Sequence, residues 1–335
     1  MVELPPDLAV GIDRQLRGVS QRDLARASAD LSAQYRQKQE HRAPVARTEA
    51  AVLAYAATRL PATYAAVTSA LRAARDRRPD WEPASLLDLG AGPGTAAWSA
   101  TTVWPSIQQI AAVETEPSMV ALGNDLARSA HHPAIQSATW TRASLLDAAP
   151  AGQHDLVILA YVLAELEAGS QDRVVDLAAA ATATPAGLTV VVEPGTPEGY
   201  RRVLRARERL LAGGASVIAP CPHSRACPMS ETDWCHFAVR LPRSAMHRAA
   251  KGADLGYEDE KFAYVAASRE PTPPAPARVL RHPQVRPRHI QLELCTPGGL
   301  ASLAVTKRDG DRFRLARKVG WGDNFTYTVH GAPQH

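Results

Sequence analysis

The chain has 335 residues, of which 45% are hydrophobic and 21% charged, and its formal net charge at pH 7 is +4. This length excludes a small disulfide-stapled fold, and the composition is that of a globular protein rather than a disordered one. The sequence lacks an uninterrupted apolar run of the ~18 residues that a membrane span needs, and its start does not have the pattern of a signal peptide. We therefore expect a cytoplasmic protein without a membrane partner; the sequence leaves the oligomeric state open.

Residues 1–80 predict an N-terminal helical region. Ser20 and Asp23 resemble a capping box, and Leu24, Ala27 and Leu31 recur at helical spacing. Packing against the rest of the protein is the simplest role for these helices. A cap on the substrate side is the alternative, since their exposed faces carry several arginines.

From residue 85 the pattern changes to short apolar runs that alternate with helix-compatible segments, as expected for an α/β fold with a doubly wound, mostly parallel sheet. The strands expected first are residues 85–89, 110–114, 139–143, 155–160 and 188–193. The expected helices are residues 118–130, 171–183 and 198–211. Further strands are expected at residues 215–218, 236–241 and 262–267. We assign this domain to residues 81–270.

The C-terminal residues 271–335 predict a small antiparallel β unit. The segment PTPPAP (271–276) reads as a linker, because proline joins neither a helix interior nor a central strand. Strands are expected at residues 290–294, 302–306 and 312–316. From Glu270 onward the chain has ten Lys or Arg and five Asp or Glu residues, so the basic excess lies in this unit.

A glycine-rich turn follows the first expected strand. It reads Asp88-Leu89-Gly90-Ala91-Gly92-Pro93-Gly94-Thr95, and a helix is expected next. Alternating glycines at a strand–helix turn allow close approach of the backbone to a ligand, and the helix start offers free N–H groups. A plain tight connection is the structural alternative.

Glu114 strengthens the ligand interpretation. It ends the second strand, where an acid can accept hydrogen bonds from two ribose hydroxyls. The pattern resembles class I S-adenosylmethionine-dependent methyltransferases, whose first motif is GxGxG preceded by an acid, here Asp88. A dinucleotide dehydrogenase would more typically have Gly or Ala at position 95. The ends of the third and fourth strands, at Ser144, Leu145 and Tyr161, are then expected to hold the adenine and methionine parts.

The chemistry of the acceptor is less well defined. Strand four runs into Ala160-Tyr161 rather than the Asn/Asp-Pro-Pro-aromatic turn used to methylate exocyclic base amines. Glu193, Tyr161 and Glu165 are candidates for a base near the methyl group, although acids at strand ends are as often structural. Pro220-Cys221 superficially matches a cytosine-C5 nucleophile, but Cys221 has a better explanation.

Three of the four cysteines lie within fifteen positions, at Cys221, Cys227 and Cys235, and Cys295 follows sixty residues later. Four thiolates can close a tetrahedral zinc site or hold a four-iron cluster. Wide loops favour the larger iron–sulfur cluster, because structural zinc sites prefer tight Cys-x2–4-Cys knuckles. The alternative is four unrelated buried cysteines. His223 and His236 are interpreted as loop residues rather than ligands.

Several segments together resemble the Rsm-twenty-two (Rsm22) family of methyltransferase-like proteins, the mitochondrial small-subunit ribosome assembly factors and their bacterial relatives. The segments are residues 87–94, VEPGTPEGY (192–200), APCPH (219–223), CP (227–228), DWCHF (233–237), ARK (316–318) and WGD (321–323), together with Tyr55 and residues 59–64. The resemblance covers most of the chain.

This resemblance implies a class I methyltransferase fold, a four-cysteine iron–sulfur cluster, and association with small-subunit ribosomal RNA in assembly or translation. It implies that Cys221, Cys227, Cys235 and Cys295 are the ligands of a [4Fe-4S] cluster, which would tie the C-terminal unit to the sheet domain. Basic side chains of the C-terminal unit would contact RNA phosphates, unless they form only a solvated face. They are Arg278, Arg281, Arg286, Arg288, Lys307, Arg308, Arg317 and Lys318.

Three functions remain open from the sequence. The first is an S-adenosylmethionine-dependent methyltransferase, or methyltransferase-like protein, acting on small-subunit ribosomal RNA. The second is a non-catalytic RNA-binding assembly factor of the small ribosomal subunit. The third is a small-molecule methyltransferase with a structural zinc in the cysteine site.

Overall fold

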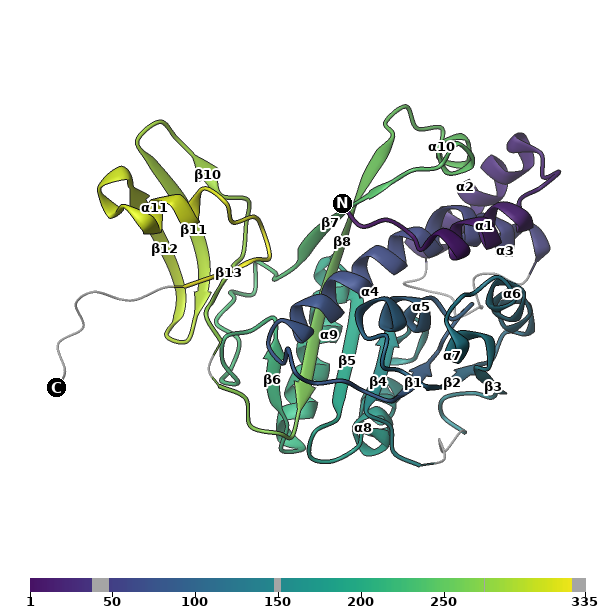
Figure 1. Ribbon diagram of the computed structural model, residues 1–335, viewed down its shortest axis with the longest axis horizontal. Coiled ribbons are helices and arrows are strands. Elements are labelled where there is room, and N and C mark those ends of the chain that lie inside the picture. Colours follow the sequence, from purple (N-terminus) through teal and green to yellow (C-terminus); the bar gives the residue numbers. More distant parts are fainter. Residues whose placement is uncertain (38–47, 148–151, 274, 327–335) are drawn as a thin grey trace.

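The computed structural model describes residues 1–37, 48–147, 152–273 and 275–326. Figure 1 shows an α/β body and a second, smaller sheet beside it. In the described residues the main sheet has eight strands in the order β3-β2-β1-β4-β5-β8-β6, with β7 paired to β8. Its strands are β1 (Ser85–Leu89), β2 (Gln109–Glu114), β3 (Thr139–Arg142), β4 (Leu156–Ala160), β5 (Leu188–Pro194), β6 (Ser216–Ala219), β7 (Phe237–Pro242) and β8 (Tyr257–Ser268).

Strands β1 to β5 are parallel, and β8 runs antiparallel to its neighbours β5, β6 and β7. Helices on both faces make the sheet doubly wound, so the predicted fold class is confirmed. The carboxyl ends of β1 to β4 meet at one edge of the sheet, which is where ligands bind in such folds.

Successive side chains of the central strands enter two different hydrophobic cores. Leu86 and Val190 belong to the core on one face, whereas Leu87 and Val191 belong to the core on the other. This alternation follows from the two-residue period of a strand. Because both faces are buried, these strands appear in the sequence as continuous apolar runs.

The N-terminal helices pack into the first of these cores together with the sheet. They are α1 (Pro6–Gln15), α2 (Gln21–Gln37), α3 (Glu49–Ala54), the π-helix η1 (Tyr55–Arg59) and α4 (Leu60–Arg75). On the same face lie α5 (Thr95–Val103), α6 (Pro117–Ala127) and α7 (Pro133–Gln136). The helices of the opposite face are α8 (Ala168–Ala181) and α9 (Pro197–Ala212), preceded by the short 3-10 helix η2 (Leu163–Glu165).

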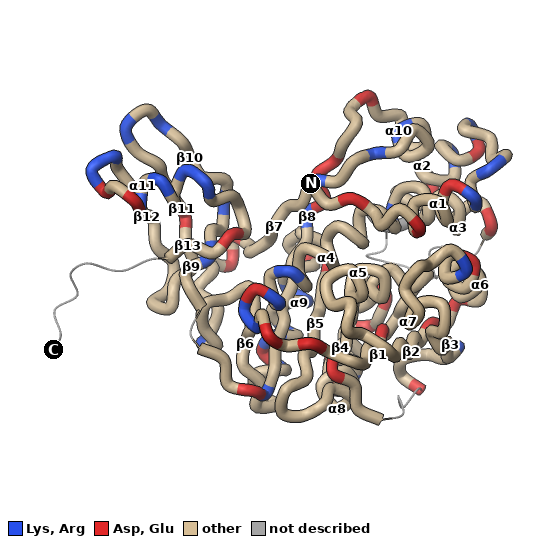
Figure 2. Tube along the Cα trace, viewed as in Figure 1, with Lys and Arg blue, Asp and Glu red and all other residues tan. Residues whose placement is uncertain are grey.

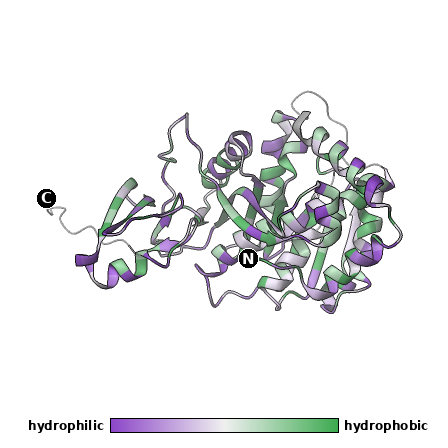
Figure 3. Ribbon diagram, turned by 90° about the horizontal axis from the view of Figure 1, so that it is seen from above, coloured by the Kyte–Doolittle hydropathy of each residue, from purple (hydrophilic) through white to green (hydrophobic). Residues whose placement is uncertain are grey.

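The second sheet is antiparallel and has its own small hydrophobic core. Its elements are β9 (Ala277–Val279), β10 (Gln284–Val285), β11 (His289–Thr296), β12 (Gly299–Thr306), the 3-10 helix η3 (Lys307–Asp309), α11 (Asp311–Ala316) and β13 (Asn324–Phe325). In the structure, the elements of the C-terminal unit span residues 277–325, and the name refers to these residues from here on. Figure 3 shows it projecting from one end of the body.

The strand predicted at residues 312–316 is wrong, because this segment is the helix α11. Phe313 and Ala316, three residues apart, face the core of the C-terminal unit, so helical spacing rather than alternation places the apolar side chains. Another helix, α10 (Ala245–Lys251), lies between β7 and β8 and was not predicted. Among the described residues, no helix is both long and apolar enough to cross a membrane.

Candidate functional site

The glycine loop, residues 88–95, requires glycine for conformation and for space. Gly90, Gly92 and Gly94 have φ angles of +72°, +54° and +78°, a left-handed region that other residues rarely adopt. A Cβ atom at Gly90 would also lie 2.2 Å from Val162 Cγ2. The loop is fixed to β2, because the N–H groups of Gly90 and Ala91 donate to the Val113 carbonyl. Gly94 directly precedes α5, whose first N–H groups have no acceptor within the helix.

Glu114 lies next to the glycine loop. Its Oε2 accepts the N–H of Gly92 at 2.8 Å, and its Oε1 accepts the N–H groups of Thr115 and Glu116 at 2.7 and 2.9 Å. Since each carboxylate oxygen has about two acceptor positions, Oε2 keeps one for a ligand hydroxyl. Hydrogen bonding to a ribose hydroxyl would require such a free acceptor position.

Asp88 is buried behind the loop, with 1% of its surface exposed. Burial, together with the negative charge of Glu114, raises the pKa of Asp88 to about 7. Its Oδ2 finds no hydrogen-bond partner among the described residues. A buried polar atom without a partner beneath a glycine loop fits a site that takes a polar ligand.

The ends of β3 and β4 complete this edge. Ser144 Oγ accepts the N–H of Leu146 at 3.2 Å, and Leu145 is buried beside Gly90. Tyr161 has a φ of +61°. Among the described residues, no other residue except glycine has a positive φ. Such backbone strain is concentrated at functional sites. The structure thus brings the predicted residues from β1 to β4 to one edge of the sheet.

The acidic groups near this edge are paired. The Tyr161 hydroxyl donates to Glu260 Oε1 at 2.9 Å, and Arg59 Nη2 lies 3.7 Å from the same oxygen. Burial raises the pKa of Tyr161 well above its usual value. Glu193 is fully buried: its Oε2 accepts from Arg202 Nε at 2.8 Å, and its Oε1 accepts the N–H of Leu163 at 3.0 Å. Burial raises the pKa of Glu193, and the charge of Arg202 opposes this shift.

Tyr55 was missed as a site residue by the sequence analysis. Its hydroxyl lies 3.8 Å from where a Cβ atom of Gly92 would be, so the side chain lies beside the glycine loop. Burial raises the pKa of Tyr55 to about 12. Tyr55 begins the π-helix η1, a widened turn that is frequent at functional sites. Hydrophobic periodicity predicts a helix here but not its widened turn.

The four cysteines line one cavity between the main sheet and the C-terminal unit, which we call the cysteine cavity. Its volume of about 40 Å³ exceeds what one water molecule needs. Cys221 and Cys227 lie in the segment after β6, Cys235 lies just before β7, and Cys295 is on β11. The fold therefore brings Cys295 of the C-terminal unit to the three cysteines of the body.

Burial raises the pKa of the Cys221, Cys235 and Cys295 thiols, the last to about 12, and the charges of neighbouring cysteines raise each further. Arg207 and Arg278 line the same cavity and lower the pKa of Cys221 and Cys295. The thiolates repel one another, so holding all of them charged requires cations in or beside the cavity.

Two polar side chains contact the thiols. Tyr200 Oη lies 3.3 Å from Cys227 Sγ, and His223 Nε2 lies 3.8 Å from Cys295 Sγ. In the described part of the chain, however, no three His, Cys, Asp or Glu side chains converge closely enough to hold a single metal ion. The four thiols that line the cavity are nevertheless the ligand type that a zinc ion or an iron–sulfur cluster would use.

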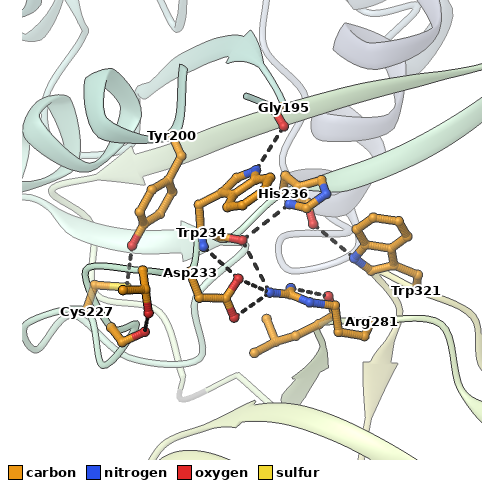
Figure 4. A network of polar contacts seen from close by, with 11 residues as sticks. Gly195, Tyr200, Cys227, Asp233, Trp234, His236, Arg281 and Trp321 are labelled. Atoms are coloured by element: carbon orange, nitrogen blue, oxygen red, sulfur yellow. Dashed lines mark hydrogen bonds and ion pairs between the residues drawn. The ribbon is translucent and has the colours of Figure 1, made fainter. Parts of the chain in front are cut away.

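Residues 220–236, which carry Cys221, Cys227 and Cys235 and which we call the cysteine segment, are fixed to both parts of the molecule (Figure 4). Trp234 Nε1 donates to the Gly195 carbonyl at 3.0 Å, on the side of the body. On the other side, Arg281 Nη2 donates to both carboxylate oxygens of Asp233, at 2.6 and 2.7 Å, and Trp321 Nε1 donates to the His236 carbonyl at 2.9 Å. These contacts hold the C-terminal unit against the body.

The eight basic residues predicted to contact RNA fall into two groups. Six are exposed, and Figure 2 shows Lys and Arg gathering around β10 and α11. The six are Arg286, Arg288, Lys307, Arg308, Arg317 and Lys318. The assignment of Arg278 as a phosphate contact is wrong, since it is 3% exposed in the cysteine cavity. Arg281 is partly buried and occupied by Asp233.

The profile of one protein family, described as mitochondrial small ribosomal subunit Rsm22, matches residues 49–326. The chain belongs to the Rsm22 family. It is 30% identical over 298 residues to the human ribosome assembly protein METTL17, mitochondrial, a match that covers 82% of this chain and 62% of that protein. It is 26% identical over 332 residues to the Rsm22-cox11 tandem protein 2, mitochondrial, of Schizosaccharomyces pombe, covering 83% of this chain and 43% of that protein.

The chain thus spans less than two thirds of the length of these Rsm22 relatives. Among solved structures, an O-methyltransferase family protein from Burkholderia thailandensis is 15% identical, with a TM-score of 0.44 over 72% of this chain and 68% of that chain. The strand order of the main sheet, with antiparallel β8 between β5 and β6, is that of a class I methyltransferase fold. The predicted family and fold are confirmed.

Proposed function

We propose that this Rsm22 protein is an S-adenosylmethionine-binding, methyltransferase-like assembly factor of the small ribosomal subunit. It holds a four-cysteine [4Fe-4S] cluster and acts on the subunit's RNA in the cytoplasm. The observation that carries the proposal is the cysteine cavity, to which the body gives three thiols and the basic C-terminal unit gives the fourth. A centre with these ligands fixes a basic surface relative to a methyltransferase-like body.

S-adenosylmethionine, when bound, supplies a methyl group activated on a sulfonium sulfur. The glycine loop would contact the cofactor through its main chain, because Gly90, Gly92 and Gly94 have no side chains that would prevent close approach. Glu114 Oε2 would accept a ribose hydroxyl, while Ser144 and Leu145 would flank the adenine. Tyr55, whose hydroxyl lies beside Gly92, would help to exclude water from this edge. These roles are positional, and methyl transfer depends mainly on proximity and orientation.

The non-catalytic assembly factor is the second candidate, and the paired acids favour it. Glu193 is engaged by Arg202 and a backbone N–H, and Glu260 by Tyr161 and Arg59. A general base needs an acceptor within hydrogen-bond reach of the proton it removes. With these carboxylates occupied, binding without turnover agrees with the site.

The first experiment purifies the chain without oxygen and counts iron, sulfide and zinc per chain, for the wild type and for Cys295→Ser. About four irons and four sulfides, lost in Cys295→Ser and kept in the control Ser302→Ala on the adjacent strand, support the cluster. One zinc without sulfide overturns the cluster and supports the third function, a small-molecule methyltransferase with a structural zinc.

The second experiment separates enzyme from scaffold. The purified protein is incubated with S-adenosylmethionine labelled on the methyl group and with small-subunit RNA, free or in particles. Label in the RNA identifies an RNA methyltransferase. Salt-dependent RNA binding without label identifies the non-catalytic factor. Absence of salt-dependent RNA affinity overturns the role on the small subunit.

A further inference from the structure

Two arginines lie buried beside the four thiols. Arg207, on α9, and Arg278, on β9, are each 3% exposed, and both line the cysteine cavity. They come from different parts of the molecule, Arg207 from the body and Arg278 from the C-terminal unit. Buried charged side chains are uncommon unless they are paired, so each of these positions needs an explanation.

Backbone carbonyls satisfy only part of each guanidinium. Arg207 Nη2 donates to the carbonyls of His223 and Arg225, at 3.1 and 2.5 Å. Arg278 Nε donates to the Pro220 carbonyl at 3.0 Å, and its Nη1 donates to the Gly322 carbonyl at 2.7 Å. These bonds orient both side chains, and they connect the cysteine segment to α9 and to the C-terminal unit.

The remaining N–H groups have no acceptor. Arg207 Nε and Nη1 and Arg278 Nη2 are buried without a hydrogen-bond partner among the described residues. Nor does any described carboxylate form an ion pair with either guanidinium within 4.0 Å. Leaving a buried charged donor unpaired costs more than leaving a neutral one unpaired, so the cavity contains unused capacity for an anion.

We propose that Arg207 and Arg278 form the cationic wall of the cysteine cavity, where their free N–H groups donate hydrogen bonds to the sulfur atoms of a four-thiolate metal centre. This inference rests on the proposed function, since the centre is part of it. Four thiolates around a [4Fe-4S] core of charge +2 carry a net charge of −2, and two guanidiniums offset it. Four thiolates on one Zn²⁺ would carry the same net charge.

The wall has two consequences for such a centre. Hydrogen bonds to ligand sulfurs and nearby charge help to hold the metal, and loss of such partners typically costs about 10-fold or more in metal affinity. Nearby positive charge also stabilises the reduced cluster relative to the oxidised one, because reduction adds a negative charge. Removing a wall arginine should therefore speed metal loss and make the reduction potential more negative.

The test compares Arg207→Met and Arg278→Met with the wild type and with the control Arg205→Met. Methionine keeps much of the length and removes the charge and the donors. Arg205 is on the same helix but exposed, and it pairs with Asp172. The metal is counted after anaerobic purification, and its rate of release to a chelator is measured. For an iron–sulfur centre, the midpoint potential is also measured.

We expect each Met variant to release metal about 10-fold faster, with the potential shifted to a more negative value and Arg205→Met unchanged. Arg207→Lys and Arg278→Lys keep the charge but not all of the donors. They should therefore restore the wild-type midpoint potential more fully than the wild-type rate of metal release. Loss of the carbonyl contacts alone would loosen the loop without this recovery by lysine. Circular dichroism and the melting temperature identify any variant that fails to fold. If a Met variant does not fold, the comparison of the Lys variant with the wild type tests the wall instead.

The outcomes separate this inference from the proposed function. A wild type with four irons whose Met variants keep unchanged potential and release rate overturns the cationic wall and leaves the cluster standing. A wild type with one zinc overturns the cluster, and faster zinc release from the Met variants, recovered in part by lysine, then still supports the wall. A wild type that takes up neither metal overturns both.

Discussion

Gly90 has the least room for a side chain in the glycine loop. The substitution Gly90→Ala adds a Cβ at a φ of +72°, 2.2 Å from Val162 Cγ2. We expect it to lower the free energy of unfolding by about 2 kcal/mol or more and to weaken S-adenosylmethionine binding. Urea unfolding and calorimetric titration measure these effects. Gly169→Ala is the control, because that helical glycine has open space around it; equal effects at both positions would contradict the steric argument.

Asp88 should make stability depend on pH. Its pKa in the folded protein is about 7 because burial disfavours the carboxylate, whereas in the unfolded chain it is about 3.9. Between these values the folded state binds the extra proton, so this group's contribution to stability falls as pH rises from about 4 to 7, by at most about 4 kcal/mol. Asp88→Asn should remove this loss.

We therefore expect Asp88→Asn to gain stability relative to the wild type at pH 7.5 but not at pH 4.5. Urea unfolding at the two pH values measures the difference. The same change in unfolding free energy at both values would show that Asp88 titrates normally in the folded chain.

At the scale of elements, the β7-α10-β8 segment depends on one carboxylate. Glu258 of β8 accepts from Lys251 Nζ at 2.7 Å and from Arg243 Nη2 at 2.9 Å, and its Oε1 is 3.4 Å from His247 Nε2. Burial by itself would raise the pKa of Glu258, but the nearby His247 and the hydrogen bond from Lys251 outweigh it and hold the pKa well below its usual value.

Glu258→Gln should reduce the free energy of unfolding by about 2 kcal/mol at pH 7, since Arg243 and Lys251 lose their shared anion. Because the pKa is lowered in the folded state, this stabilisation is present above the unfolded pKa of about 4.3 and is lost as pH falls further. Thermal melting across pH 3 to 7 checks both points. The neighbouring pair of Asp259 and Arg240 is half exposed, so Asp259→Asn should cost about 0.5 kcal/mol or less.

Elements with long apolar runs could be predicted from the sequence, and short amphipathic ones could not. Strands β1 and β5 are buried on both faces, so their patterns were unambiguous. Helix α11 has only six residues, too few to distinguish helical spacing from alternation. Helix α10 is similarly short, and its role comes from contacts with α2 that no local pattern encodes.

The same division applies to the candidate site. Gly90, Glu114 and the cysteines stand out by residue type and spacing, so the sequence identified them. Tyr55, Arg59 and Glu260 reach the site only because η1 and β8 pack against the edge of the sheet. Arg278 looked like a surface cation in the sequence, and only the junction between the two sheets shows that it is buried.

At the scale of the whole molecule, the exposed basic surface of the C-terminal unit predicts salt-dependent RNA affinity. Arg317 and Lys318 are both exposed at the end of α11. Their double alanine variant should weaken binding of small-subunit RNA and reduce the slope of log affinity against log salt by about 2, one for each phosphate that is no longer neutralised.

Filter binding over a range of salt concentrations measures this slope. The control is the double alanine variant of Arg205 and Arg209, whose charges pair with Asp172 and Asp176 on α8. An unchanged slope in the Arg317 and Lys318 variant would show that RNA is bound on another surface.

The position of β8 determines when the main sheet can close during translation. β8 is the last strand of this sheet to be synthesised, yet it lies between β5 and β6. A nascent chain that has reached residue 242 therefore contains β1 to β7 but has the hydrogen-bonding edges of β5, β6 and β7 open. Such open edges can pair with other chains. The main sheet can therefore close, and these edges be paired, only after residue 268 is available.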